Sequence, residues 1–166
     1  MTSSMRSMTW CIAFMAISIS AYNQTTKPEQ PSTQAANTAG LFPKGEIIDK
    51  AHFSSGTAWV YWIMPADSIY NTQLASVTYE QGTRTKWHYH PAGQILIITS
   101  GTAYYQEKGK PRQILSKGAM VKCPPNVPHW HGSSPGSAMT AIAINPNMQK
   151  GGVVWLDMVT DDEYLK

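Results

Sequence analysis

From about residue 56 onward, short apolar runs alternate with turns rich in glycine, proline and polar residues. The runs are rich in β-branched and aromatic residues, and no helical period separates them, which favours β-strands. We expect strands at residues 59–63, 73–79, 85–89, 94–99, 102–106, 114–115, 120–123, 130–131 and 139–144. Strands that recur every 8–12 residues or so predict a sandwich or a barrel.

The breaks between these strands follow from the same pattern. Ser100 and Gly101 give a turn signal between two of the runs, and residues 108–110 give a hairpin signal. The segment 155–164 is the one place where we expect a helix. The sequence therefore predicts an all-β fold with a short C-terminal helix.

The first 42 residues differ from this pattern. Residues 1–21 combine one charge, Arg6, with an apolar run at 10–17 and small residues after it, as in a secretory signal peptide. The run is shorter than the about 20 apolar residues of a membrane span. We therefore expect no membrane span and an exported protein, periplasmic or secreted; a short buried N-terminal helix is the alternative. Residues 22–42 are polar and predict a flexible linker, which leaves residues 43–166 as a single domain.

Composition supports one domain and narrows the range of partners. The chain has 166 residues and is 42% hydrophobic, which is enough for one core and excludes wholesale disorder. Only 14% of the residues are charged, and the positive charges behind the net +3 are scattered. A nucleic-acid binder shows a clustered basic surface, so we expect no nucleic-acid partner.

Cysteine and aromatic residues bear on how the domain is held together. Cys11 falls within the expected signal peptide, so Cys123 has no partner for an intramolecular disulfide and is expected to pack as a small hydrophobe. The stretch 59–63 is aromatic and uncharged, which is an aggregation hazard on an exposed strand. We expect a homodimer or a higher homo-oligomer that covers it.

Histidine gives the strongest functional signal. The chain has five histidines, and four of them form two His-x-His pairs, His88 with His90 and His129 with His131. Side chains at i and i+2 of a strand share a face, so each pair points one way. Gln94 follows the first pair after the turn at residues 91–93 and comes alongside it if that turn folds the chain back. Convergent neutral imidazoles with one oxygen donor predict a site for a divalent metal.

The surrounding residues resemble the cupin superfamily. The run Gly82-x5-His88-x-His90-x3-Gln94-x6-Gly101 is similar to its first motif, with Gln94 in place of the usual glutamate. The run Gly118-x5-Pro124-x-Asn126-x2-His129-x3-Ser133 is similar to its second motif, with Asn126 for a glycine and Ser133 for an asparagine. The resemblance implies a cupin barrel, a jelly roll of the double-stranded β-helix type.

The resemblance narrows to small bacterial cupins that include the manganese-dependent (R)-selective hydroxynitrile lyases. It rests on the stretches 87–94, 124–125, 129–132, 137–140 and 159–164, together with Trp155. It implies one metal ion, manganese first, held by His88, His90, Gln94 and His129, with His131 inward beside the metal as a non-ligand. Those lyases carry a further active-site histidine where this chain has Ala141.

The chemistry of such a site follows from its charge. Three imidazoles and a carboxamide are neutral, so the metal keeps its full charge and favours anionic partners. Manganese, iron, nickel, cobalt and zinc all suit the donor set. His131 is the candidate catalytic base or, alternatively, a residue that orients a ligand or water. The candidate pocket residues, for each of which core packing is the favoured interpretation, are Leu96, Ile98, Met120, Trp130 and Met139.

These features predict a metal-dependent enzyme of small molecules with lyase-type chemistry on a carbonyl or hydroxyl compound. The alternatives are an iron-dependent dioxygenase, an isomerase or hydratase, and a metal-binding module without catalysis. His52 lies outside the motifs, and we expect it on the surface or in an oligomer contact.

Overall fold

The computed structural model describes residues 40–166. The expected signal peptide, residues 1–21, and all but the end of the expected linker, residues 22–42, lie outside the described residues. No helix among residues 40–166 is long and apolar enough to cross a membrane.

The described chain is almost entirely β-structure, in line with the expected fold class. Its strands are β1 (Glu46–Ile47), β2 (Phe53–Ser55), β3 (Ala58–Met64), β4 (Gln73–Tyr79), β5 (Arg84–Thr85), β6 (His88–Tyr89), β7 (Gln94–Glu107), β8 (Gln113–Ser116), β9 (Met120–Cys123), β10 (His129–Ser133), β11 (Met139–Asn145) and β12 (Val154–Trp155). The helical elements are two 3₁₀ turns, η1 (Lys50–His52) and η2 (Met148–Lys150), and the helix α1 (Asp161–Leu165).

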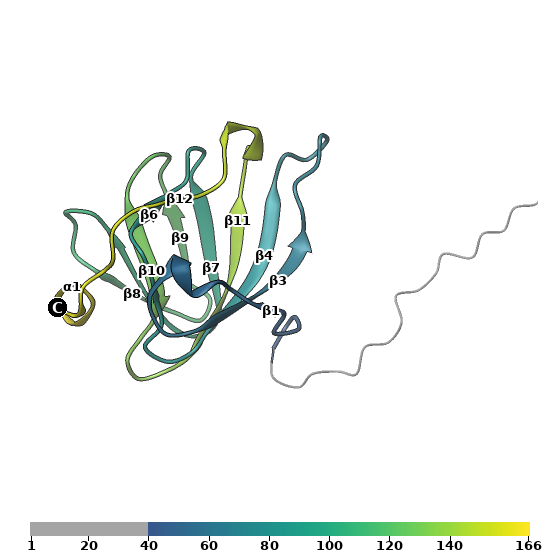
Figure 1. The fold of residues 1–166 in the computed structure, drawn as a ribbon. Coiled ribbons are helices and arrows are strands. Elements are labelled where there is room, and N and C mark those ends of the chain that lie inside the picture. The colour runs from purple at the N-terminus through teal and green to yellow at the C-terminus, as the bar shows by residue number, and fades with distance from the viewer. Residues whose placement is uncertain (1–39) are drawn as a thin grey trace, which may run out of the picture. The chain divides into compact units, whose positions relative to one another are not determined.

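The strands form one antiparallel sheet that curls into a half-barrel (Figure 1). The order along the sheet is β1-β3-β4-β11-β7-β10-β5-β2, with β8 and β9 paired to β7, and β6 joining β10 to β12. The first half of β7 pairs with β9 and β11, and its second half pairs with β8 and β10. Strand β7 therefore belongs to both walls of the barrel and joins them.

The turn expected at Ser100 and Gly101 is wrong, because β7 runs through both residues. Gly101 has a φ of 72°, and a Cβ there would lie 1.9 Å from the carbonyl oxygen of Ala138. Glycine relieves both constraints, since it has no Cβ and tolerates positive φ. The pairing with β11 shifts register between Thr140 and Ala141 at the same level, so the turn signal marks a bend within one long strand.

The expected strand 85–89 is also two strands, β5 and β6, separated by Lys86 and Trp87. The expected helix at 155–164 is shorter, because Trp155 belongs to β12 and the helix begins at Asp161. A capping box between Thr160 and Glu163 sets that start.

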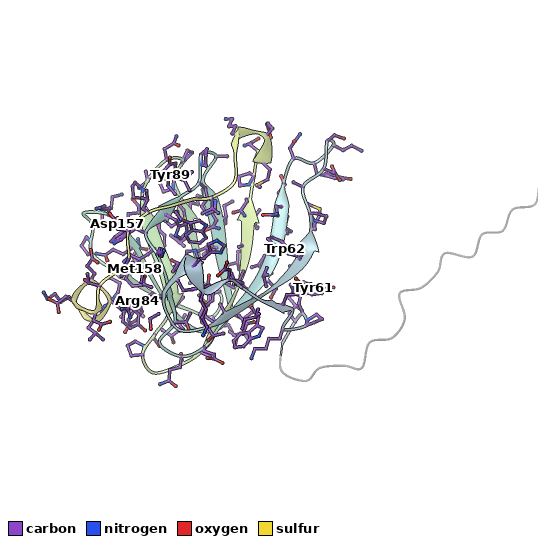
Figure 2. The ribbon with its side chains drawn as sticks, viewed as in Figure 1. Tyr61, Trp62, Arg84, Tyr89, Asp157 and Met158 are labelled. Atoms are coloured by element: carbon purple, nitrogen blue, oxygen red, sulfur yellow. The ribbon has the colours of Figure 1, made fainter. Side chains whose placement is uncertain are left out.

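Alternation along the strands sorts residues between two cores. The inward residues of β4, β7 and β11 form the barrel core with Cys123, which is buried as expected of a small hydrophobe. A second cluster lies on the outer face of β10 and consists of Trp87, Trp130, Val159 and Tyr164. It attaches the C-terminal segment to the barrel, where Arg84 binds the Val159 carbonyl and pairs with Asp161. Figure 2 shows Arg84, Asp157 and Met158 on the side that carries α1.

Candidate metal centre

The four histidines of the two pairs come together inside the barrel. His88 on β6 lies directly opposite His129 on β10 in the antiparallel register, and their ring centroids are 4.4 Å apart. The ring of His88 is 5.4 Å from that of His90 and 5.0 Å from that of His131. All four side chains are buried. The alternation of side chains along a strand therefore brings both pairs to one point, as the sequence predicts.

Local backbone contacts orient two of the imidazoles. His88 Nδ1 lies 2.9 Å from the Lys86 carbonyl oxygen, and His129 Nδ1 lies 2.9 Å from the Val127 carbonyl oxygen. A carbonyl only accepts, so each Nδ1 carries the proton and each Nε2 keeps its lone pair. Within residues 40–166, the buried Nε2 atoms of His90 and His129 have no hydrogen-bond partner. Buried polar atoms are nearly always paired, so these orphaned atoms fit a metal ion.

Burial keeps the cluster neutral. Desolvation, with a smaller contribution from the nearby His129, lowers the pKa of His90 to about 4. Burial, followed by the charges of neighbouring imidazoles, also holds the pKa values of His88 and His131 well below the usual range. Burial lowers the pKa of His129 as well. A metal binds the deprotonated imidazole, so the lowered pKa values leave the nitrogens available at neutral pH.

Three of the histidines can hold a divalent metal ion together. Ring nitrogens of His88, His129 and His131 all lie within 4.8 Å of one another. His90 is not in this trio, although its ring is 5.8 Å from that of His129. The resemblance instead implies His90 as a ligand and His131 as a neighbour of the metal, so the geometry brings all four together and leaves two possible ligand sets.

Gln94 lies at the start of β7 and faces the same cavity as the histidines. Its Nε2 donates to Asn145 Oδ1 at 3.0 Å, and Asn145 Nδ2 donates to Gln73 Oε1 at 3.2 Å. This amide chain engages the nitrogen end of the Gln94 side chain. Its Oε1 has only the weak donor Cys123 Sγ at 4.0 Å, which leaves a carbonyl oxygen available as a donor to a metal.

His131 has a different second partner from His88 and His129. Its Nδ1 lies 3.2 Å from Tyr79 Oη, and its backbone N–H donates to Thr85 Oγ1 at 3.2 Å. Burial raises the pKa of Tyr79, so the phenol stays neutral and acts only as a hydrogen-bond partner. When Nδ1–H donates to the phenol oxygen, the Nε2 lone pair of His131 is free to take a proton.

A cavity of about 270 Å³ lies against this cluster. Strand β4 and strands β7 and β11 supply a wall of small and branched apolar side chains, namely Ala75, Val77, Leu96, Ala141 and Ala143. The other wall carries His88, His90 and His131, and Trp62, Val153 and Trp155 also line the space. A concave, mostly apolar space with a few convergent polar groups is typical of a small-molecule site.

Of the candidate pocket residues, Leu96 lines this cavity and the other four do not. Ile98 and Met139 are buried in the barrel core, and Met120 is 54% exposed. Trp130 packs on the outer face of β10, and its indole N–H donates to Gln106. Trp130 lies between His129 and His131 on the strand, so the alternation that turns the histidines inward turns Trp130 outward.

The structure adds residues that the sequence did not single out for this site. Tyr79, Asn145 and Trp155 line the cavity, and Trp155 packs 4.9 Å from the His88 ring. His52, which is expected on the surface or in an oligomer contact, is half-buried and lines the cavity. These residues come from distant strands, and only the alternation within β4 and β11 hints at which of their residues face inward.

Comparison with known proteins gives concordant results. Residues 75–145 match the family model of the cupin domain. A stretch of 92 residues is 43% identical to an (R)-mandelonitrile lyase of Granulicella tundricola, and it covers 55% of this chain and 70% of that protein.

Solved structures agree with the family match. A cupin-like protein from Thermotoga maritima superposes with a TM-score of 0.72 at 43% identity, over 75% of this chain and 93% of the other. The DMSP lyase DddQ from Ruegeria pomeroyi has a TM-score of 0.54 at 18% identity, over 74% of this chain and 59% of the other. The second likeness is at the level of the fold alone.

Proposed function

This chain belongs to the cupin superfamily, and from that premise we propose that it is a metal-dependent lyase that cleaves a small hydroxynitrile into a carbonyl compound and hydrogen cyanide. The observation that carries the proposal is the buried histidine cluster with orphaned Nε2 atoms, set in a chain similar to a mandelonitrile lyase. Fold alone does not fix the reaction, so the residues of the site carry the proposal.

The proposed ligands of one divalent metal are His88, His90, Gln94 and His129. Backbone carbonyls orient His88 and His129, and the amide chain through Asn145 orients Gln94. Manganese is the first choice, and iron, nickel, zinc and cobalt suit the same nitrogen and oxygen donors. When bound, such an ion supplies a Lewis acid that stabilises negative charge on a substrate oxygen.

His131 is the proposed catalytic base. Its Nε2 takes the proton of the substrate hydroxyl, the oxygen forms the carbonyl double bond, and the carbon–carbon electron pair leaves with cyanide. His131 then returns the proton to cyanide, so hydrogen cyanide departs and the site is restored. Tyr79 supports this role, because its oxygen accepts from Nδ1–H in the tautomer that leaves Nε2 free.

The apolar wall is proposed to hold the body of the substrate. The alanines at positions 75, 141 and 143 leave room, and Val77 and Leu96 exclude water from the space beside the histidines. A low-polarity cavity strengthens electrostatic interactions with the reacting oxygen. An aryl or alkyl hydroxynitrile fits this division into a polar and an apolar side.

The direct test uses protein loaded with manganese and mandelonitrile as the substrate. We expect benzaldehyde to form, followed by its absorbance, and we expect activity to be lost after chelation and restored by manganese. His131→Gln tests the base, since it fills a similar volume without taking a proton. Absence of benzaldehyde with one equivalent of metal bound would contradict the proposal, and turnover that requires oxygen would favour the dioxygenase.

The two ligand sets are separated by metal analysis of two variants. If His90 is a ligand, His90→Ala lowers the bound metal while His131→Ala keeps it and loses activity. The opposite result assigns the trio of His88, His129 and His131 as the ligands. Each variant is the control for the other, because both remove one buried imidazole from the same cluster.

We also propose that the protein is exported and that two copies associate. Strand β3 pairs with β1 only at Trp59 and Val60, and Trp62, labelled with Tyr61 on β3 in Figure 2, is 50% exposed. An open, aromatic edge of this kind is usually covered. We expect a dimer by light scattering that Trp62→Lys weakens, and N-terminal sequencing of the exported protein is expected to start near residue 21 or 22.

A further inference from the structure

His52 lines the cavity beside the histidine cluster, although it is far from the two histidine pairs in sequence. It ends the turn η1, and its imidazole stacks on the indole of Trp155 with centroids 4.6 Å apart and planes 10° apart. Both rings line the cavity. His52 is only partly buried, whereas the four clustered histidines are buried. The fifth histidine therefore lies where the cavity meets solvent.

The backbone around His52 is fixed from both sides. Asp49 Oδ1 accepts from the Ala51 N–H at 2.9 Å, and the His52 carbonyl accepts from the Lys86 N–H at 3.1 Å. Trp155 is held in turn, because β12 pairs with β6 and places Trp155 opposite His88. The imidazole is thus positioned on rigid neighbours, which is what a contact to substrate requires.

The polar edge of this ring has no hydrogen-bond partner among residues 40–166, whereas the amide and hydroxyl groups that line the cavity are paired. Gln94 donates to Asn145, Thr85 Oγ1 donates to the His131 carbonyl, and Tyr79 is engaged with His131. The His52 imidazole makes no hydrogen bond to any of residues 40–166. A neutral imidazole carries one N–H donor, and a protonated one carries two. His52 can therefore donate a hydrogen bond into the cavity in either state.

The cavity wall opposite His52 offers no hydrogen-bond donor at Ala141. Ala141 lines the same cavity on that wall and has no polar side-chain atom. The hydroxyl end of a hydroxynitrile belongs beside His131 and the proposed metal ligands. The nitrile end then needs a separate donor, because negative charge develops on cyanide as the bond breaks.

We propose that His52 is a catalytic residue that donates a hydrogen bond to the nitrile nitrogen of the substrate. The inference rests on the proposed function. It adds no proton transfer: His131 takes and returns the proton, the electron pair leaves with cyanide, and His52 stabilises that charge. Cyanide therefore departs on the solvent side of the cavity.

The first test compares two variants of the manganese-loaded protein. His52→Phe keeps a flat ring against Trp155 and removes the donor, so kcat for mandelonitrile is expected to fall about 30-fold or more. His52→Gln keeps a donor and is expected to recover part of that loss. Both variants should bind one metal ion and melt near the parent temperature. An unchanged kcat in His52→Phe, or equal losses in both variants, would overturn the inference.

A second arm places a donor on the opposite wall. Adding Ala141→His to His52→Phe is expected to restore part of kcat, because the new imidazole faces the same cavity. A merely structural role for His52 predicts no restoration. The melting temperature of the double variant checks that the larger side chain is accommodated.

A binding measurement tests the contact without turnover. Phenylacetonitrile has the nitrile but no hydroxyl, and ethylbenzene has neither polar group; both are titrated by calorimetry into the metal-loaded protein. His52→Phe is expected to weaken phenylacetonitrile about 5-fold to 10-fold and to leave ethylbenzene unchanged. Equal effects on both, or no binding of phenylacetonitrile, would overturn the inference. A selective effect without mandelonitrile cleavage would defeat the proposed function alone.

Discussion

The two walls of the cavity are made of the same structure, antiparallel strands with alternating side chains, yet they differ in what they place inside. The histidine wall, formed by β6 and β10, turns imidazoles inward. The apolar wall, formed by β4, β7 and β11, turns alanine, valine and leucine inward. Among residues 40–166, the buried Nε2 atoms of His90 and His129 have no hydrogen-bond partner, whereas the apolar wall is continuous with the barrel core.

The difference shows how one barrel separates stability from chemistry. Burying an unpaired polar group costs free energy, so the histidine wall opposes folding until its nitrogens find a ligand. Burying apolar side chains drives folding. The apolar wall thus supports a reactive wall that is not stable in its own right, and changes on the two walls should have different signatures.

The largest expected effect is on the histidine wall. His88→Ala removes a proposed ligand at the centre of the cluster, and we expect loss of bound metal and a fall in activity of about a thousandfold, as expected for several kcal/mol of lost charge stabilisation. Metal analysis and the mandelonitrile assay measure both. Tyr89→Ala is the matched control on the other face of β6 (Figure 2). Equal metal content in the two variants would show that His88 is no ligand.

The apolar wall should respond in the opposite way. Leu96 is 2% exposed, and Leu96→Ala is expected to lower the free energy of unfolding by about 3 kcal/mol while the metal content stays at its parent value. Chemical denaturation and metal analysis give the two numbers. The neighbour Ile97 faces the other side of β7 and is less buried, so Ile97→Ala should cost clearly less. Loss of metal in Leu96→Ala would mean that the two walls are not separable.

Acid should act through the histidine wall. Burial lowers the folded-state pKa of His90 from 6.5 to about 4, so the unfolded chain binds more protons between those values. Stability is then complete above about pH 6.5 and falls as the pH drops toward 4. At pH 5, His90 alone accounts for about 2 kcal/mol in the metal-free protein, from 1.36 kcal/mol per pH unit.

The measurement compares denaturation of metal-free parent and His90→Gln at pH 7 and pH 5. The acid-induced loss should be about 2 kcal/mol smaller in the variant, since glutamine does not titrate. His88 and His131 titrate in the same direction and remain in both proteins. An identical loss in the two proteins would mean that His90 is not the neutral buried imidazole that its surroundings indicate.

The position of the histidine cluster can be predicted from the sequence. The convergence of His88 with His90 and of His129 with His131 follows from local alternation, which needs no knowledge of the fold. The same rule turns Trp130 outward, so it does not line the pocket that the sequence predicts for it. Local rules therefore locate the histidine cluster well.

What the sequence missed depends on contacts between distant segments. Ser100 and Gly101 have the composition of a turn, but pairing with β8, β9, β10 and β11 carries β7 through them. His52 reaches the cavity because η1 folds over it and Trp155 returns from the C-terminal segment. Neither the continuation of β7 nor the position of His52 leaves a periodic signal in the sequence, because each depends on which distant segments become neighbours.

The smallest expected effect tests whether the proposed metal site depends on a hydrogen bond within the wall of β4, β7 and β11. Asn145 on β11 accepts from Gln94 Nε2, and Asn145→Ala frees that amide to rotate. We expect manganese affinity to fall about tenfold, the lower end for groups that orient a ligand. Asn145→Asp still accepts from Gln94 and adds a negative charge, so its affinity should equal or exceed that of the parent. Calorimetric titration of manganese into the metal-free proteins measures this affinity.

If the alanine and aspartate variants weaken manganese binding equally, the hydrogen bond to Gln94 does not matter. If neither weakens it, Gln94 is not a ligand, and the histidine wall holds the metal without help from the wall opposite.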